Sequence, residues 1–276
     1  MSSLIGIFDI DNVGKRWGVR ILFLFTMVIM AAVEFNPMAD SDFSLLNGWL
    51  IDYVDTMAKN PMAQMNTLPP FTEGNIIYII TLFIAFFILL TASYIYSALY
   101  VREFRKVRME VLGKGKASPE VLDYSSRQLP SSPIEPKKLV GRVALLVLVS
   151  LAIFLPLMII ALNFSFFLLL GLPFIFTIPV AYLSGDKGLF PAIPYSVKLS
   201  SKYYFVNMRY IAVIFFVGLV TSFILGIAAN ISLTAYYILD SAVTTWLFFS
   251  FARLAGVAYC NMRDIPANRG RRPLAI

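Results

Sequence analysis

Residues 76–100 read IIYIITLFIAFFILLTASYIYSALY and contain no charged side chain. An α-helix rises about 1.5 Å per residue, so about 20 such residues cross the roughly 30 Å of hydrocarbon in a bilayer. The run therefore predicts a tilted transmembrane helix. In VREFRKVRMEVLG, which follows, arginines recur every third residue and the stretch ends at Gly113, so we expect the helix to continue as a polar rod and stop at that glycine.

The composition of the whole chain places it in the same class. It has 276 residues, of which 59% are hydrophobic, and a mean hydropathy of +0.76. Soluble domains contain only about 45 to 50% apolar residues. We therefore predict an all-α, polytopic integral membrane protein with a single membrane domain over residues 1–276.

Further apolar stretches lie on both sides of the first. The longest, residues 139–184, exceeds the length of one crossing, so we expect a tight turn at residues 163–165 to divide it in two. The first predicted span, residues 21–35, is short. In all, the sequence predicts six spans, at residues 21–35, 76–100, 139–162, 165–184, 210–229 and 232–256.

The positions of the basic residues predict the topology, because Lys and Arg collect in short cytoplasmic loops. With the amino terminus inside, 22 of the 23 basic residues fall on the inner side, and Lys59 alone falls outside. The predicted outer loop, residues 36–74, carries five acids instead. We therefore expect both termini in the cytoplasm, at a plasma or inner membrane. The net charge of +7 reflects this topology and does not indicate nucleic-acid binding.

The predicted inner segments offer surfaces for lipid or protein. Residues 113–138 are rich in Ser and Pro and read as a tether, with docking of a partner as the alternative. Basic residues on the preceding helix are expected to attract anionic lipid of the inner leaflet, or else only to fix orientation as a solvated face. These residues are Arg102, Arg105, Lys106 and Arg108.

Residues 184–210, SGDKGLFPAIPYSVKLSSKYYFVNMRY, are the most charged stretch in the second half of the chain. On a helical projection one face is apolar, and the basic residues cluster within about 40° on another side. This pattern predicts an interfacial amphipathic helix that anchors the fifth span, with its basic side as a second, docking role. The apolar face comprises Leu189, Ile193, Val197 and Tyr204, and the basic side Lys198, Lys202 and Arg209.

The order GLFPAIPYSVKLSSKYYF within this stretch resembles the segment between two spans in bacterial multi-span proteins similar to the membrane domain of glycerophosphoryl diester phosphodiesterases. In that group a Gly/Pro entry and an Ala precede a Ser, a basic residue, a Leu and an aromatic pair. The matching residues here are Ala192, Ser196, Lys198, Leu199, Tyr203 and Tyr204. The resemblance covers about residues 140–260 and implies a six-helix membrane domain without catalysis of its own.

Two charged residues fall in or near the last predicted span. Asp240 and Arg253 are separated by 12 residues, about 18 Å of helix, which is shorter than the membrane core. At least one of them is therefore expected inside the membrane zone, where charges are costly and mark candidate functional sites. Asp240 is either a proton- or cation-responsive group in a cavity or a structural residue between helices that is hydrogen-bonded or protonated. Tyr236 and Thr244, one turn before and after it, are within reach as partners. Arg253 is expected to extend to the inner surface.

Small residues at four-residue spacing predict close helix packing, within one chain or between subunits. They are Gly218, Ser222 and Gly226 on the fifth span, and Ala252 and Gly256 on the sixth. In the outer loop, FSLLNGWLIDYVDTM has apolar residues at helical spacing and is expected to lie on the outer membrane surface or to cover a partner.

Catalytic motifs are missing from the sequence. The chain contains no histidine and a single cysteine, and neither a GxSxG motif nor a P-loop occurs. We expect no enzymatic activity, no cofactor and no metal site. The sequence predicts a non-catalytic scaffold or accessory subunit that contacts lipids and other membrane subunits, or a second copy of itself. The alternative is a carrier of a small solute or lipid that uses Asp240 and proline-broken helices.

Overall fold

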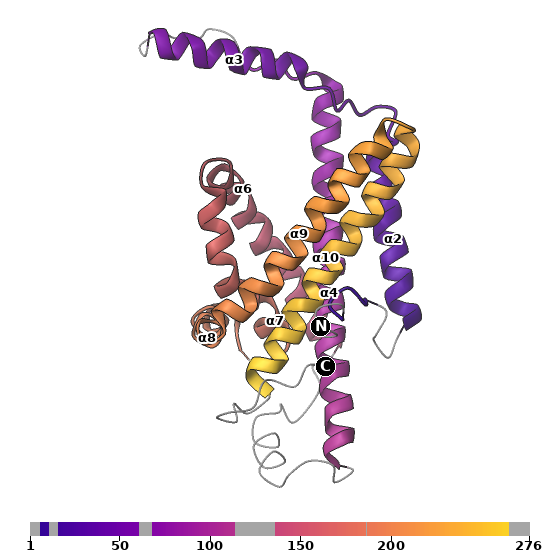
Figure 1. Ribbon diagram of the computed structural model, residues 1–276, viewed down its shortest axis with the longest axis vertical. Helices are drawn as coiled ribbons and strands as arrows, with labels where there is room; N and C mark the ends of the chain where they lie inside the picture. The colour runs from indigo at the N-terminus through magenta and orange to yellow at the C-terminus, as the bar shows by residue number, and fades with distance from the viewer. Residues whose placement is uncertain (1–5, 11–15, 61–67, 114–135, 186, 265–276) are drawn as a thin grey trace.

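The computed structural model describes residues 6–10, 16–60, 68–113, 136–185 and 187–264 (Figure 1). Every regular element in these ranges is helical, which confirms the all-α part of the predicted fold class. The elements are α2 (Arg16–Glu34), α3 (Ser44–Lys59), α4 (Glu73–Gly113), α6 (Pro136–Ile175), α7 (Ile178–Leu183), α8 (Leu189–Ser201), α9 (Tyr204–Ala229) and α10 (Leu233–Asp264).

Four helices in the described part of the chain are long and apolar enough to cross a membrane. They comprise Trp17–Glu34, Glu73–Lys106, Tyr204–Ala229 and Leu233–Arg263. Each contains most or all of one of the six predicted spans, so the chain is a helical, membrane-type protein. The prediction that the helix after residue 100 continues without a break to Gly113 is also confirmed.

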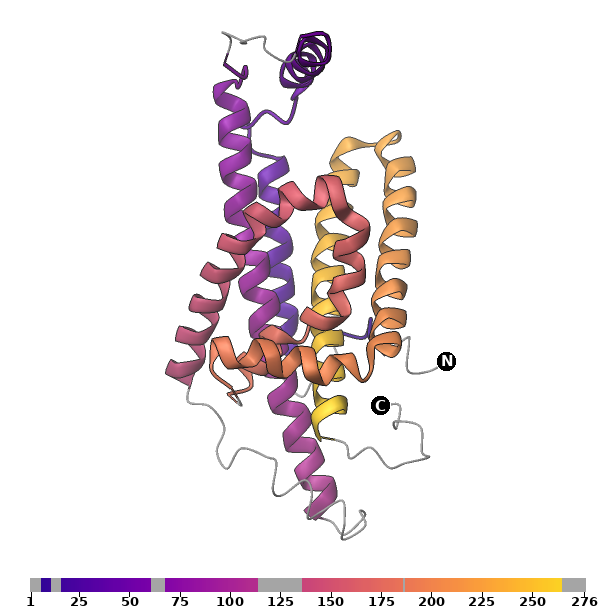
Figure 2. The same ribbon diagram turned by 90° about the vertical axis from the view of Figure 1, so that its left-hand side faces the viewer.

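The third predicted span and the first part of the fourth form one helical element, α6, and the rest of the fourth contains the short helix α7. Residues 163–165 lie inside α6, so the predicted turn that interrupts the helix there is wrong. The physical reason is that apolar surroundings favour a backbone that keeps its own hydrogen bonds. Yet the two ends of α6 are close: Nη1 of Arg142, near its start, donates to the carbonyl of Tyr182, beyond its end, at 2.6 Å. A straight helix of 40 residues is about 60 Å long, so α6 must fold back on itself, as Figure 2 shows.

α2, α4 and α10 pack around a shared aromatic cluster. The ring of Phe249 on α10 lies 5.1 Å from that of Tyr96 on α4 and 5.9 Å from that of Phe23 on α2. Tyr96, Phe249 and Val19 of α2 are fully buried. These contacts hold together three helices that are distant in the sequence.

The larger core cluster lies where α6, α7, α8, α9 and α10 meet. Leu146 and Val147 from the first arm of α6, Val180 of α7, Ile211 of α9 and Tyr259 of α10 are among its buried members. After α7, Gly185 turns the chain with a φ of 82°, a value that only glycine adopts without strain.

α8 lies crosswise to the long helices, near the end of the bundle where α10 finishes (Figure 2). It begins after the extended Gly188 and ends at Ser201. The predicted single helix over residues 184–210 is therefore wrong in its extent, because a turn at residues 202–203 separates α8 from α9. Tyr204 and Arg209 belong to α9, so they do not share a helical face with Ile193 and Lys198.

Candidate functional site

The N-terminus of α4 carries a reciprocal cap. The backbone N–H of Asn75 donates to Oγ1 of Thr72 at 3.0 Å, and the N–H of Thr72 donates to Oδ1 of Asn75 at 3.3 Å. Such a pair satisfies backbone donors that the first helical turn leaves without partners. The start of α4 is therefore fixed by two side chains.

The same Asn75 side chain also holds the segment that leads into α3. Its Nδ2 donates to the carbonyls of Asp40 and Asp42, both at 2.9 Å, and Asn75 is almost completely buried. The N–H of Asp40 donates to the carbonyl of Gly74 at 3.0 Å. A Cβ on Gly74 would lie 2.7 Å from that of Asp40, so this close approach requires glycine. We call Asp40, Asp42, Thr72, Gly74 and Asn75 the α3–α4 junction.

Successive carboxylates continue the junction into α3. Oδ1 of Asp40 accepts from the N–H of Asp42, and Oδ1 of Asp42 accepts from the N–H of Ser44, both at 2.9 Å. Hydrogen bonds from the backbone and then the side chain of Ser44 lower the pKa of Asp42 from its ordinary value. A charged Asp42 therefore stabilises the first turn of α3.

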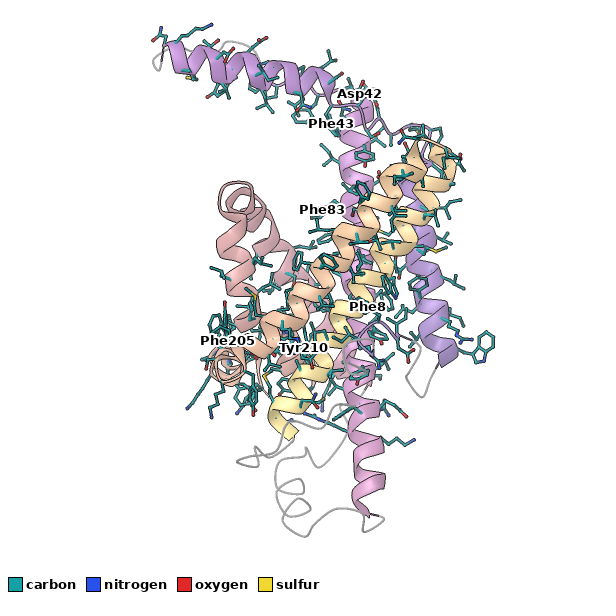
Figure 3. The ribbon with its side chains drawn as sticks, in the orientation of Figure 1. Phe8, Asp42, Phe43, Phe83, Phe205 and Tyr210 are labelled. Atoms are coloured by element: carbon teal, nitrogen blue, oxygen red, sulfur yellow. The ribbon has the colours of Figure 1, made fainter. Side chains whose placement is uncertain are left out.

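α3 projects from the end of α4 as an arm directed away from the bundle (Figures 1 and 3). None of its residues is buried. Leu45, Ile51 and Val54 are each more than 60% exposed, and the rings of Trp49 and Tyr53 stack at 5.4 Å. The predicted helix in the outer loop is thus present. It presents an apolar surface that the described part of the chain leaves uncovered.

Asp240 lies on α10, within an apolar helix, and is half-buried. The predicted partners Tyr236 and Thr244 lie on the same helix, one turn before and after it. Neither donates a hydrogen bond to the Asp240 carboxylate, and no other residue in the described ranges does so.

Arg253 is covered by protein and is only 5% exposed. Its guanidinium lies 5.0 Å from the centre of the Tyr100 ring on α4. The prediction that this side chain extends to the inner surface is wrong, because the close crossing of α4 and α10 encloses it. One turn further on, a Cβ on Gly256 would lie 2.8 Å from Cδ1 of Tyr100, and Ala252 is buried beside the same helix.

The small residues of α9 divide between two surroundings. Gly218 faces α10, where Cδ1 of Leu247 would contact an added Cβ at 3.5 Å. Ser222 and Gly226 are exposed, and within the described part of the chain an added Cβ on Gly226 would meet nothing within 4 Å. The structure therefore uses Gly218 within the chain and leaves the other two small residues open.

A segment of turns before the first span, residues 6–10, was not predicted to be buried. Ile7 is 3% exposed, and the rings of Phe8 and Trp246 of α10 lie 5.1 Å apart (Figure 3). Nε1 of Trp246 donates to the carbonyl of Phe8 at 3.2 Å, and the hydroxyl of Tyr96 donates to the carbonyl of Ile10 at 3.1 Å. The sequence signal that could have predicted this burial is the presence of three apolar residues within four positions, Ile7, Phe8 and Ile10.

The predicted basic surface is only partly exposed. Lys198, Lys202 and Arg209 are exposed, as are Arg102 and Lys106. Arg105 is buried, so the expectation that it contacts lipid headgroups is wrong. The side chain of Arg108 lies outside the described residues. Arg102 and Lys106 lie on α4 next to the buried residues Val101 and Arg105.

Within the described ranges, no three His, Cys, Asp or Glu side chains gather in a way that could hold a metal ion. The predicted resemblance around residues 188–205 involves α8, where Ala192 and Ser196 form part of the buried face. No family model, curated protein or solved structure matches the chain, so that resemblance stays a prediction.

Proposed function

We propose that the chain is a non-catalytic scaffold or accessory subunit of a complex in the plasma or inner membrane. In this proposal it crosses the membrane six times, with both arms of α6 as spans and both termini in the cytoplasm. The bias of basic residues towards the predicted inner segments supports this topology.

The observation that carries the proposal is the α3 arm. Its apolar side chains are exposed, yet its direction is fixed by the hydrogen bonds of the α3–α4 junction. Large exposed apolar surfaces mark sites of protein or membrane interaction. A fixed direction lowers the conformational entropy lost when such a surface binds a partner.

The exposed small residues of α9 give a second, separate surface. Ser222 and Gly226 lie one turn apart on a helix that is apolar enough to span. Small residues at this spacing let the backbone of another membrane helix approach closely. In the proposal, this side of α9 packs against a helix of another subunit.

The test is the mass and composition of the complex extracted from its native membrane in mild detergent, with a tag on the carboxyl terminus. We expect other polypeptides, or further copies of this chain, in fixed ratio. Gly226→Leu should remove them without loss of the folded chain, because a Cβ added to Gly226 meets no other described residue within 4 Å. Gly218→Leu is the matched control and should instead reduce stability by crowding Leu247.

Recovery of the wild-type chain as a monomer, with no fixed companion, would contradict the scaffold proposal. Full assembly of the Gly226→Leu variant would exclude the α9 surface. Deletion of residues 44–59 would then show whether the α3 arm alone is responsible.

The second candidate is a carrier of a small solute or lipid. The observation in its favour is Asp240, a half-buried acid within an apolar helix that makes no hydrogen bond to a described residue. A carrier should lose transport in the Asp240→Asn variant while its expression and assembly stay unchanged. A scaffold should keep its complex in the same variant.

A further inference from the structure

The buried side of α8 is built from small side chains. Ala192, Ser196 and Ser200, spaced four apart, are fully buried, and Oγ of Ser200 lies 3.0 Å from Oγ1 of Thr177 next to α7. Small residues let the α8 backbone lie close to α6 and α7. This contact determines which sides of α8 face outward.

The side next to the buried one is apolar and open. Phe190 is 80% exposed, Ile193 is 44% exposed and Val197 is partly exposed. On a helical projection these three fall within an arc of about 60°. Phe205, at the start of α9, is 84% exposed, and Figure 3 shows it at the α8–α9 corner.

The third side of α8 is basic. Lys198 is exposed on α8, and the exposed Lys202 follows the helix as its C-cap with a helical backbone conformation. With the projection continued to Lys202, the two lie about 40° apart, on the far side of the apolar arc from the buried face. Lys187, just before the helix, lies 5.2 Å from the centre of the Tyr195 ring, and Arg209 is exposed on α9. The sequence contains no acidic residue from position 187 to position 239, so nothing along this stretch offsets the positive charge.

The three sides of α8 therefore suit three different surroundings. The buried side packs against protein, the apolar side suits hydrocarbon, and the basic side suits lipid headgroups. Interfacial helices place an apolar side in the acyl region and a basic side among anionic headgroups. We propose that the outward sides of α8 form a binding site for an anionic phospholipid. Lys198 and Lys202 contact its phosphate, and its acyl chains lie along Phe190, Ile193 and Phe205.

This site goes beyond the scaffold proposal and shares with it only the topology, in which α8 lies at the cytoplasmic face. It also differs from a general attraction of the inner surface. Arg102 and Lys106 are exposed on α4, but residues 100, 101 and 103–105 around them are buried or half-buried, whereas Lys198 and Lys202 lie beside an exposed apolar arc. A lipid with both a charged head and acyl chains fits only the second arrangement.

The experiment uses the full chain in nanodiscs of phosphatidylcholine with increasing phosphatidylglycerol, and native mass spectrometry counts the lipids that stay bound. The test variant is Lys198→Gln with Lys202→Gln. The matched control is Arg102→Gln with Lys106→Gln, which removes the same charge from exposed positions on α4. We expect about a 30-fold loss of phosphatidylglycerol affinity in the α8 variant, from two lysines near the surface, and little change in the control.

Equal losses in the two double variants would overturn the proposal in favour of general surface attraction, and so would unchanged binding in both. A third arm adds inorganic phosphate to the detergent-solubilised chain. Stabilisation by phosphate as large as that by phosphatidylglycerol would show an anion site without a lipid component, which also overturns the proposal. None of these outcomes depends on whether other subunits copurify, so the scaffold proposal is tested separately.

Discussion

Asn75 is the residue that makes most of the hydrogen bonds of the α3–α4 junction. Its Oδ1 caps α4 by accepting from Thr72, while its Nδ2 holds the carbonyls of Asp40 and Asp42. One buried amide therefore joins the start of a span to the chain that leads into α3. An amide is suited to this position because it donates and accepts at the same time.

Replacement of Asn75 separates these two roles. Asn75→Ala removes three hydrogen bonds and should cost about 3 kcal/mol of unfolding free energy, at roughly 1 kcal/mol for each bond. Asn75→Asp keeps an acceptor for Thr72 but loses both donors, so the start of α4 should stay protected while α3 is released. Hydrogen exchange of the α4 amides and a spin label at Lys59 measure the two effects. Equal mobility of the label in wild type and both variants would exclude the junction as the support of α3.

The charge of Asp42 makes the same junction sensitive to acid. Because its folded-state pKa lies below the ordinary value of 3.8, its contribution to stability is complete above about pH 4. That contribution is lost as the pH falls through the folded-state pKa. The mobility of a spin label on α3 should therefore rise only on acidification below about pH 4. Asp42→Asn keeps an oxygen acceptor without the charge, and this step should be absent from its titration.

Elements of the fold were predicted to different degrees by the sequence. The spans α4 and α9 could be predicted because each contains a long uncharged apolar run, and α10 because it is apolar enough to span in spite of Asp240 and Arg253. The end of α4 at Gly113 could be predicted from a local signal. The break between α8 and α9 could not, because residues 202–203 read Lys-Tyr and carry no strong helix-breaking signal.

The candidate sites followed the same division between local and long-range information. The exposure of Lys198 and Lys202 was expected from their place on one helical side. The burial of Arg253 depends on which helices cross at Tyr100 and Gly256, and one sequence does not specify that pairing. The Asn75 junction joins residues 33 to 35 positions apart through backbone carbonyls, which leave no signature in side-chain patterns.

The segment at residues 6–10 is the element that propensity arguments missed. A non-helical backbone beside membrane spans is stable only where protein satisfies its polar groups. Here Trp246 and Tyr96 supply donors to two of its carbonyls. Its position among α2, α4 and α10 therefore depends on side chains of the spans more than on its own backbone.

Conservative replacement of these donors should loosen the segment without disturbing the spans. Trp246→Phe and Tyr96→Phe each keep an aromatic ring and remove one donor, and each should cost about 1 to 2 kcal/mol because a carbonyl is left unsatisfied. Limited proteolysis within residues 6–10 should become faster in both variants. The control is Trp17→Phe, which changes an exposed ring and should leave the cleavage rate unchanged. Phe249→Tyr is not a suitable control, because Phe249 is fully buried.

At the scale of the whole molecule, the number of membrane crossings depends on how α6 lies in the membrane. Arg142, near the start of α6, contacts Tyr182 of α7, which follows the end of α6, and Val147 shares one core cluster with Val180 of α7. The helix therefore has two arms whose ends lie on the same side of the bundle. Six crossings result if the fold of α6 reaches the outer face, whereas a shorter hairpin that enters and leaves from the inner face gives four.

Cysteine labelling from each side of the membrane distinguishes these arrangements. The experiment uses a Cys260→Ala background. Lys59→Cys should react with an impermeant maleimide added outside, and Lys187→Cys should react only after the membrane is opened. The reason is that these exposed residues lie on opposite sides of the membrane in the proposed topology. Asn163→Cys lies at the predicted turn of α6, and under six crossings it should react from outside together with Lys59→Cys. If instead it reacts only when the inner face is exposed, α6 is a re-entrant hairpin. Both ends of α6 stay on the inner side in either case, so the basic side of α8 remains cytoplasmic. What changes is the number of helices that a partner in the outer leaflet can contact.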